Sequence, residues 1–566
     1  MKKISITFLL ACVVLATGLK AQSLQDGIND LYAERIKSAR ANFEKLVAAN
    51  PNNIDANYWL GQTYLAKDIN GQRDVKGARD VYSKALMASA NAPLLIVGMG
   101  QVELNEKNTS AATQRFETAI TMTRGKKGDD PVILDAVGRA IVNTYTDKEK
   151  IGDINYAVEK LEAAAAKDAT NPDIFLNLGT AYLKQKPGEG GGKAFENFKK
   201  ASSLSPNFAI ASYRLGKLFE SQKNWELYEQ YMNEAIAKDP RFAPAYYELY
   251  YYKLGKLDFT AAQDMATKYI SSADPDPQAD HFKAQTYWAE KNYDEAIRIS
   301  KDIISKSGDN TLPRSYMLLA DAYASKGDTA TARQYIDTYF TKADAEKVTP
   351  VQIKMRADIY LATPGQEETA VKFYQDAINA DTIQTNKVDM IKKAAAAFKA
   401  RKMYDKQVIF EQMNLDSKPN PSLTDYFNAA LAYYFDSAYG KSRDISLKME
   451  EKYPAEVYGY QWAFNNARAV DTVKKDSIAV PDALKLFEFA QKDSVKYKSV
   501  YITSAMFLVD YYINYAKDAP KALEFINRAV AIDPANENYK KIKDQIEKSM
   551  KRTGNSNAGV RDAKTG

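Results

Sequence analysis

A helical hairpin recurs along this 566-residue chain and constrains its fold more than any other feature. Its clearest copy runs from Phe208 to Pro240. Apolar residues at helical spacing predict a first helix around Leu215 and a second around Tyr228, with a polar turn between them. The second helix is predicted to end at Pro240, because proline cannot continue a helix and restricts the residue before it.

The residue that opens the second helix marks each further copy. It is mostly small or apolar, and its spacing returns to 34 residues where no loop is inserted, as from Ala194 to Tyr228 and from Tyr228 to Ala262. The markers are Ala39, Ala78, Ala112, Ala157, Ala194, Tyr228, Ala262, Ala296, Ala332, Ala370, Gln407, Ser442, Ala483 and Ala522. A small residue at a helix–helix contact allows close approach, and a large residue on the neighbouring helix fills the remaining space.

Within the 208–240 copy, the landmarks are Leu215-Gly216, Phe219, Ala235 and Pro240. Their spacing resembles the tetratricopeptide repeat, a helical hairpin of about 34 residues. The resemblance extends over nearly the whole chain, although copies ten to thirteen depart most from the pattern. It implies an all-α, right-handed superhelical solenoid of tetratricopeptide-like hairpins, one for each marker.

We expect the solenoid to span residues 22–536, followed by a capping helix at 537–552 and a disordered tail at 553–566. Longer turns are predicted at Lys184–Gly192, which is rich in glycine, and at Arg468–Pro481, which is charged and lacks helical periodicity. A break in the solenoid at about 468–481 is the alternative to one continuous array. Two further insertions, Lys67–Val75 and Tyr145–Tyr156, are predicted as surface loops of copies two and four.

Residues 1–21 have the pattern of a secretory signal peptide, with Lys2-Lys3 before an apolar run and a small residue, Ala21, before the predicted cut. We therefore expect an exported protein that is periplasmic or associated with the outer membrane, through a partner rather than directly. A lipid anchor at Cys12 is the alternative, but the apolar run continues beyond this residue, unlike that of a typical lipidation signal.

Side chains suited to catalysis or metal binding are scarce. His281 is the only histidine, Cys12 is the only cysteine and belongs to the leader, and no glycine-rich phosphate loop ends in a Gly-Lys-Ser/Thr sequence. The formal net charge is +6, of which three units come from leader lysines, so no basic footprint for nucleic acid remains. We expect no enzymatic activity, no cofactor, no metal and no nucleic-acid partner.

The resemblance implies that first-helix positions two, five, nine and twelve face a concave groove. In copies six to nine these positions hold aromatic residues, methionine and isolated charges, which are typical of protein-binding surfaces. The candidate residues are Tyr213, Lys217, Tyr247, Tyr251, His281, Trp288, Arg314, Met317 and Asp321. The clamp that some family members use for C-terminal carboxylates needs asparagine at position nine, which these copies lack, so that ligand is not carried over.

The expected function is a non-enzymatic protein–protein interaction scaffold or adaptor in the bacterial cell envelope. Its partners would be other envelope proteins or peptide segments that lie in the groove. The alternative is a glycan- or nutrient-binding surface or outer-membrane protein, because helical-repeat frames with exposed tyrosine and tryptophan also hold sugars.

Overall fold

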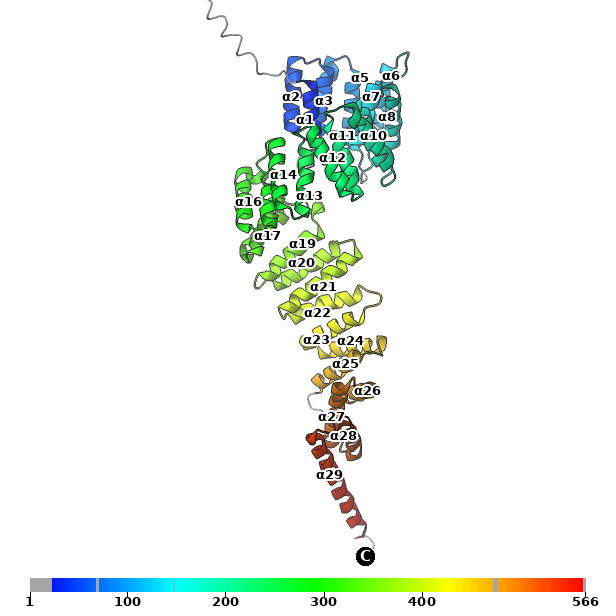
Figure 1. Ribbon diagram of the computed structural model, residues 1–566, viewed down its shortest axis with the longest axis vertical. Helices are drawn as coiled ribbons and strands as arrows, with labels where there is room; N and C mark the ends of the chain where they lie inside the picture. The colour runs from blue at the N-terminus through cyan, green and yellow to red at the C-terminus, as the bar shows by residue number, and fades with distance from the viewer. Residues whose placement is uncertain (1–22, 68–70, 147, 472–476, 563–566) are drawn as a thin grey trace, which may run out of the picture. The chain divides into compact units, whose positions relative to one another are not determined.

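A computed structural model describes residues 23–67, 71–146, 148–471 and 477–562, with side chains as far as Arg552 (Figure 1). The predicted signal peptide and Cys12 lie outside the described residues. In these ranges the regular structure is helical, with 29 α-helices and two short 3₁₀ helices. Within the described ranges there is no strand, only one isolated bridge between Gly125 and Gly128. The chain divides into two compact units, one up to Gly327 and one from Asp328.

The first unit holds helices α1 to α17. They are α1 (Leu24–Tyr32), α2 (Ile36–Ala49), α3 (Ile54–Leu65), α4 (Val75–Ala88), α5 (Pro93–Asn105), α6 (Thr109–Thr123), α7 (Pro131–Thr144), α8 (Ile154–Lys167), α9 (Pro172–Gln185), α10 (Gly191–Leu204), α11 (Ala209–Ser221), α12 (Trp225–Lys238), α13 (Ala243–Gly255), α14 (Phe259–Ser272), α15 (His281–Ala289), α16 (Tyr293–Ser307), the 3₁₀ turn η1 (Gly308–Asn310) and α17 (Pro313–Ser325).

The second unit holds helices α18 to α29. They are α18 (Thr329–Lys342), η2 (Ala345–Lys347), α19 (Pro350–Ala362), α20 (Glu367–Ala380), α21 (Gln384–Ala400), α22 (Tyr404–Asp416), α23 (Leu423–Phe435), α24 (Tyr439–Lys452), α25 (Val457–Val470), α26 (Val480–Gln491), α27 (Lys498–Asn514), α28 (Ala519–Ile532) and α29 (Glu537–Asp562).

Successive helices pair into hairpins, as the repeat predicts. Within each unit an odd-numbered helix packs against the even-numbered helix that follows, for example α3 on α4 and α27 on α28. All fourteen marker residues lie in second helices and are at most 3% exposed. Gly179 shows why small residues are needed at these contacts, since a Cβ atom there would lie 2.6 Å from Cε1 of Phe198. The predicted all-α solenoid of tetratricopeptide-like hairpins is confirmed.

The turn inside a hairpin has a recurrent local cause. In copy six, Lys223 takes the left-handed conformation (φ 56°), and the Asn224 side chain then accepts a hydrogen bond from the backbone N–H of Leu227 at 3.2 Å. Asparagine or aspartate at this position satisfies one of the free N–H groups at the start of a helix. The same pairing of a left-handed residue with a capping side chain occurs at Lys107-Asn108, Leu257-Asp258, Lys291-Asn292 and Lys517-Asp518.

The structure differs from the sequence prediction at three places. The boundary between the compact units follows Gly327, and α25 and α26, which flank the alternative break at 468–481, pack together in the same unit. Helix α29 extends to Asp562, beyond the predicted capping helix, and no proline interrupts the chain there. The short helix α15 begins only at His281, because the preceding segment contains Pro275 and Pro277.

Candidate partner-binding surface

The first helices of copies two to five close against one another. Helices α3, α5, α7 and α9 pack in succession, and Gln62, Gln101 and Arg139, which follow packing glycines of α3, α5 and α7, are buried. Gln62 donates a hydrogen bond to Oε1 of Gln101 at 2.8 Å, and Arg139 pairs with Asp135. The guanidinium of Arg139 also lies 4.6 Å from the ring centroid of Trp59. Side chains therefore fill the space between these first helices.

Copies six to eight expose aromatic residues instead. Tyr247 and Tyr251 lie one turn apart on α13, with exposed fractions of 37% and 38% and ring centroids 5.0 Å apart. Tyr247 also contacts Tyr269 at 5.8 Å and Phe282 at 5.6 Å, and Tyr251 contacts Tyr250 at 4.9 Å. Neighbouring rings pack against Tyr247 and Tyr251, so these two side chains are exposed to solvent and yet held in position. We call Tyr213, Tyr247, Tyr251, Tyr269 and Phe282 the aromatic surface.

Tyr213 and Lys217 lie at one end of this surface, on α11. The Tyr213 ring packs against Phe242 at 5.6 Å, and its hydroxyl donates to Glu248 at 3.2 Å. Burial, followed by the charge of Glu248, raises the pKa of Tyr213, so the hydroxyl stays protonated. Lys217 pairs with Glu248 at 2.9 Å and with Glu220. Its charge is therefore already balanced by two carboxylates of the same chain.

Arg314, on α17, approaches the other end of the aromatic surface. Its guanidinium carbon lies 5.5 Å from the centroid of Phe282. Its Nε atom is buried and makes no hydrogen bond to any described residue. Met317 and Asp321 follow on the same helix and are both half-buried. Unlike Lys217, Arg314 makes no ion pair within the described chain, so its charge is available to a ligand.

His281 and Trp288 are less accessible than the sequence suggested. The imidazole is buried at the start of α15, and burial, reinforced by the charge of Arg314, lowers its pKa to about 3. Trp288 is half-buried against a small core that contains Ile303 and Leu318. His281 Nδ1, Gln285 Oε1 and Trp288 Nε1 have no hydrogen-bond partner among the described residues. Sequence spacing did not single out Gln285, which shares this face of α15.

Copy one, far away in sequence, packs beside the aromatic surface. The turn between α1 and α2 places Ala33, which is fully buried, in a core with Phe208 and Phe242. The Tyr32 ring contacts Phe208 at 5.8 Å, and its hydroxyl donates to Asp173. We call residues 32–38 the clasp. No spacing rule predicted it, because the hairpin pattern describes contacts between neighbouring copies only.

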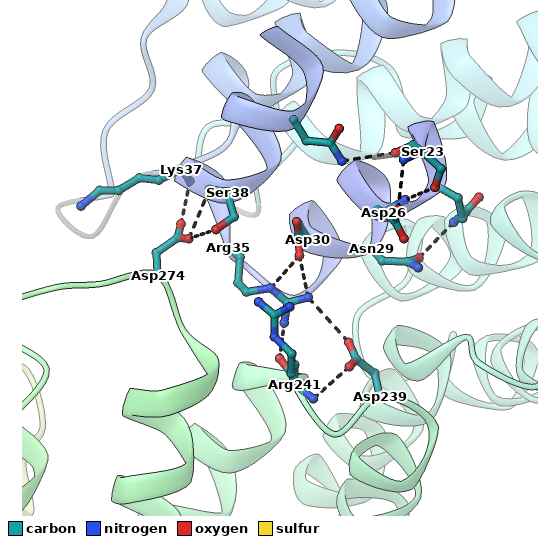
Figure 2. Close-up of polar contacts among 12 residues, drawn as sticks. Ser23, Asp26, Asn29, Asp30, Arg35, Lys37, Ser38, Asp239, Arg241 and Asp274 are labelled. Carbon is teal, nitrogen blue, oxygen red and sulfur yellow. Dashed lines mark hydrogen bonds and ion pairs between the residues drawn. The ribbon is translucent and has the colours of Figure 1, made fainter. Parts of the chain in front are cut away.

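The rest of the clasp is polar (Figure 2). The Asp274 carboxylate, in the loop between α14 and α15, accepts hydrogen bonds from the backbone N–H groups of Lys37 at 2.6 Å and Ser38 at 3.2 Å. It also accepts one from Ser38 Oγ at 2.6 Å. Arg35, only 4% exposed, pairs with Asp30 at 2.7 Å and donates to the backbone carbonyl of Arg241. A cavity of about 450 Å³ lies between α1 and the turns that precede α11 and α13.

The described residues contain no group of three histidine, cysteine, aspartate or glutamate side chains placed to bind a metal. Of the helices in the described ranges, none has both the length and the hydropathy needed to cross a membrane. The surface identified by the sequence combines aromatic rings with the Arg314 cation, residue types that are typical of protein-binding surfaces.

Comparisons with known proteins agree with the repeat pattern. Residues 24–93 match the tetratricopeptide repeat family. Among solved structures, the C-terminal part of a repeat-containing protein from Cytophaga hutchinsonii is 24% identical, with 46% of this chain and 98% of that one covered and a TM-score of 0.29. A tetratricopeptide repeat protein from Parabacteroides merdae is 17% identical, with coverage of 53% and 98% and a TM-score of 0.29.

Yeast Tom70 is 13% identical, with 74% of this chain and 95% of that one covered and a TM-score of 0.33. No protein with a curated description matches the chain. Residues 24–93 thus match the tetratricopeptide repeat family, and helical hairpins follow one another as far as the end of α28.

Proposed function

We propose that this protein is a non-enzymatic scaffold that binds an extended segment of a partner protein along copies six to nine. The observation that carries the proposal is the pair Tyr247 and Tyr251, which is exposed yet held by Tyr250, Tyr269 and Phe282. Ordered aromatic side chains lose little conformational entropy on binding and dominate the energetics of protein interfaces. Arg314, beside Phe282, would orient a partner segment through an acidic group.

The proposed setting is the bacterial cell envelope. The secretory pattern of residues 1–21 supports export, and cleavage after Ala21 would leave a chain without cysteine. The partners would then be periplasmic or outer-membrane proteins, and any membrane association would pass through them. The mass of the mature protein distinguishes cleavage after Ala21 from acylation at Cys12.

The test is capture of partners from an envelope extract by the intact mature chain and by a Tyr247→Ala/Tyr251→Ala variant. We expect the variant to weaken capture by about 2 kcal/mol or more, roughly 30-fold, the usual size of a hot-spot effect. Tyr515→Ala is a matched control, because this tyrosine is 41% exposed but lies in the second unit. Normal folding with undiminished capture by the double variant would place the binding site elsewhere.

Glycan binding is the second candidate, and one observation favours it. Helices α22 to α25 carry a chain of ring contacts, with Tyr404 stacked on Phe435 at 5.1 Å and Tyr434 against Trp462 at 5.0 Å. Tyr458, also on α25, is exposed. Flat aromatic faces with polar edges suit stacking against sugar rings as well as protein contacts. Binding on a glycan array that is lost on Trp462→Ala, with no protein captured, would select this function over the first.

A further inference from the structure

We propose that the clasp, residues 32–38 of copy one, is autoinhibitory. It covers an apolar extension of the aromatic surface, and this extension becomes exposed when copy one moves away. The extension consists of Phe175, Phe208 and Phe242, which form a core with Ala33 of the clasp. It is continuous with the aromatic surface, because Phe242 packs against Tyr213. The inhibitory role rests on the proposed partner-binding function, whereas opening of the clasp can be measured without any partner.

The start of α2, which lies in the clasp, receives its helix cap from a distant part of the chain. Helix α2 begins at Ile36, and its N-cap residue, Arg35, makes no side-chain capping bond. Asp274, 236 residues from Ser38, accepts the bonds that a local aspartate or asparagine would normally accept (Figure 2). The start of α2 is therefore fully capped only while copy one lies against the loop between α14 and α15.

Opening breaks the hydrogen bond between Tyr32 and Asp173, but it leaves the buried Arg35 with its ionic partner. Arg35 is held mainly by Asp30, which belongs to α1 and stays beside it in any position of the clasp. Its contact with Asp239 is long, at 3.9 Å. Exposed backbone N–H groups and the Asp274 carboxylate can bond to water instead. A buried ion pair that had to separate would hold the clasp shut, and the arrangement around Arg35 avoids that cost.

The apolar part of the contact is small compared with the cores that join neighbouring copies. The clasp contributes Ala33 and the half-buried ring of Tyr32, whereas copies one to five share one continuous core. In a repeat array each copy is stabilised chiefly by its neighbours. Copy one can thus separate from copies five to eight while every hairpin remains folded.

Hydroxyl-radical footprinting of Phe208 tests the opening directly. Phe208 is 6% exposed and lies under Tyr32, so its oxidation rate reports release of the clasp. Asp274→Ala should raise this rate by about fivefold, the factor that loss of a helix cap of ordinary strength gives. Phe116, buried in the core of copies one to five, is the internal reference and should not change.

Two further variants make the result decisive. Ser38→Cys/Asp274→Cys, in a mature chain with no other cysteine, should lock the clasp when oxidised and bring Phe208 oxidation below that of the wild type, with recovery on reduction. Asp276→Ala is the matched control, because Asp276 accepts a hydrogen bond from Gln278 of its own loop, and no hydrogen bond or ion pair joins it to copy one among the described residues. Equal Phe208 rates in the wild type, Asp274→Ala and the locked form would overturn the clasp, whatever the outcome of the Tyr247/Tyr251 capture experiment.

Discussion

Copies two to five and copies six to eight are built from the same hairpin, yet their first helices pack closely in the first group and make little contact in the second. In the first group α3, α5 and α7 pack against one another and bury polar residues such as Gln62 and Gln101. In the second group contact between α11, α13 and α15 is slight, and Tyr247 and Tyr251 remain exposed. The packing glycines do not cause this difference, because a Cβ atom at Gly98 or Gly100 of α5 would meet Tyr82 of α4 or Phe116 of α6, both on second helices.

This contrast shows that the repeat itself does not determine whether a copy binds. Any tetratricopeptide-like copy places four or so positions of its first helix toward the next one. Side chains that pair with those of the next first helix, as Gln62 pairs with Gln101, close this surface into a core. Bulky aromatic residues leave it available to a partner. Function in such an array is therefore decided by a few side chains on each first helix.

The largest effect is expected in the filled region. Arg139→Ala would leave Asp135 buried without its cation and should lower the free energy of unfolding by about 3–5 kcal/mol. Urea unfolding followed by circular dichroism measures this change. Arg214→Ala is the control, because Arg214 is an exposed arginine of copy six. Equal stability of the two variants would mean that copies two to five are no more of a core than copies six to eight.

A smaller, pH-dependent effect is expected at the edge of the aromatic surface. His281 has a folded pKa of about 3, well below its value in the unfolded chain, so only the unfolded state gains a proton between pH 6.5 and pH 3. Stability is therefore complete above pH 6.5 and declines as the pH falls. From pH 7 to pH 5 the loss should be about 2 kcal/mol.

His281→Gln removes this titration, so the same pH change should cost the variant about 2 kcal/mol less than the wild type. Unfolding by urea at the two pH values provides the comparison. No other histidine in the chain can produce the signal. An unchanged pH dependence in the variant would show that the imidazole is solvated, as at an open binding surface.

The smallest effect is expected at Lys217. Its ion pairs with Glu248 and Glu220 are partly exposed, so Lys217→Met should change the free energy of unfolding by about 0–1 kcal/mol. The difference from the wild type should shrink further at high salt, where exposed charges are screened. A loss as large as that of Arg139→Ala would contradict the distinction between a filled and an open region.

The fold could be predicted from the sequence because most of its contacts join helices that are adjacent in the chain. The fourteen markers, separated by one repeat each, all lie in buried contacts between adjacent helices. The same register placed Tyr213, Lys217, Tyr247 and Tyr251 together on α11 and α13. It assigned His281 to the exposed face as well, but the proline-rich segment before it delays the start of α15, and the imidazole is buried.

What the sequence did not reveal depends on the superhelix as a whole. Contacts between Ser38 and Asp274, or between Tyr32 and Asp173, arise only after several copies have turned the chain back on itself. No periodic pattern records such contacts, because the residues that make them are ordinary surface types. The boundary after Gly327 has no sequence signal either, because it falls in a turn like those of other copies.

The long-range cap at α2 also restricts the changes in repeat number that the first unit can accept during evolution. An ordinary repeat array tolerates duplication or loss of a copy, because each new copy needs only a neighbour to stack upon. Between Ser38 and Asp274 that freedom is lost: one copy more or fewer would rotate the loop between α14 and α15 away from the start of α2. Homologous chains that keep this contact should therefore share one repeat count between α2 and α15, and length variation should fall outside that interval.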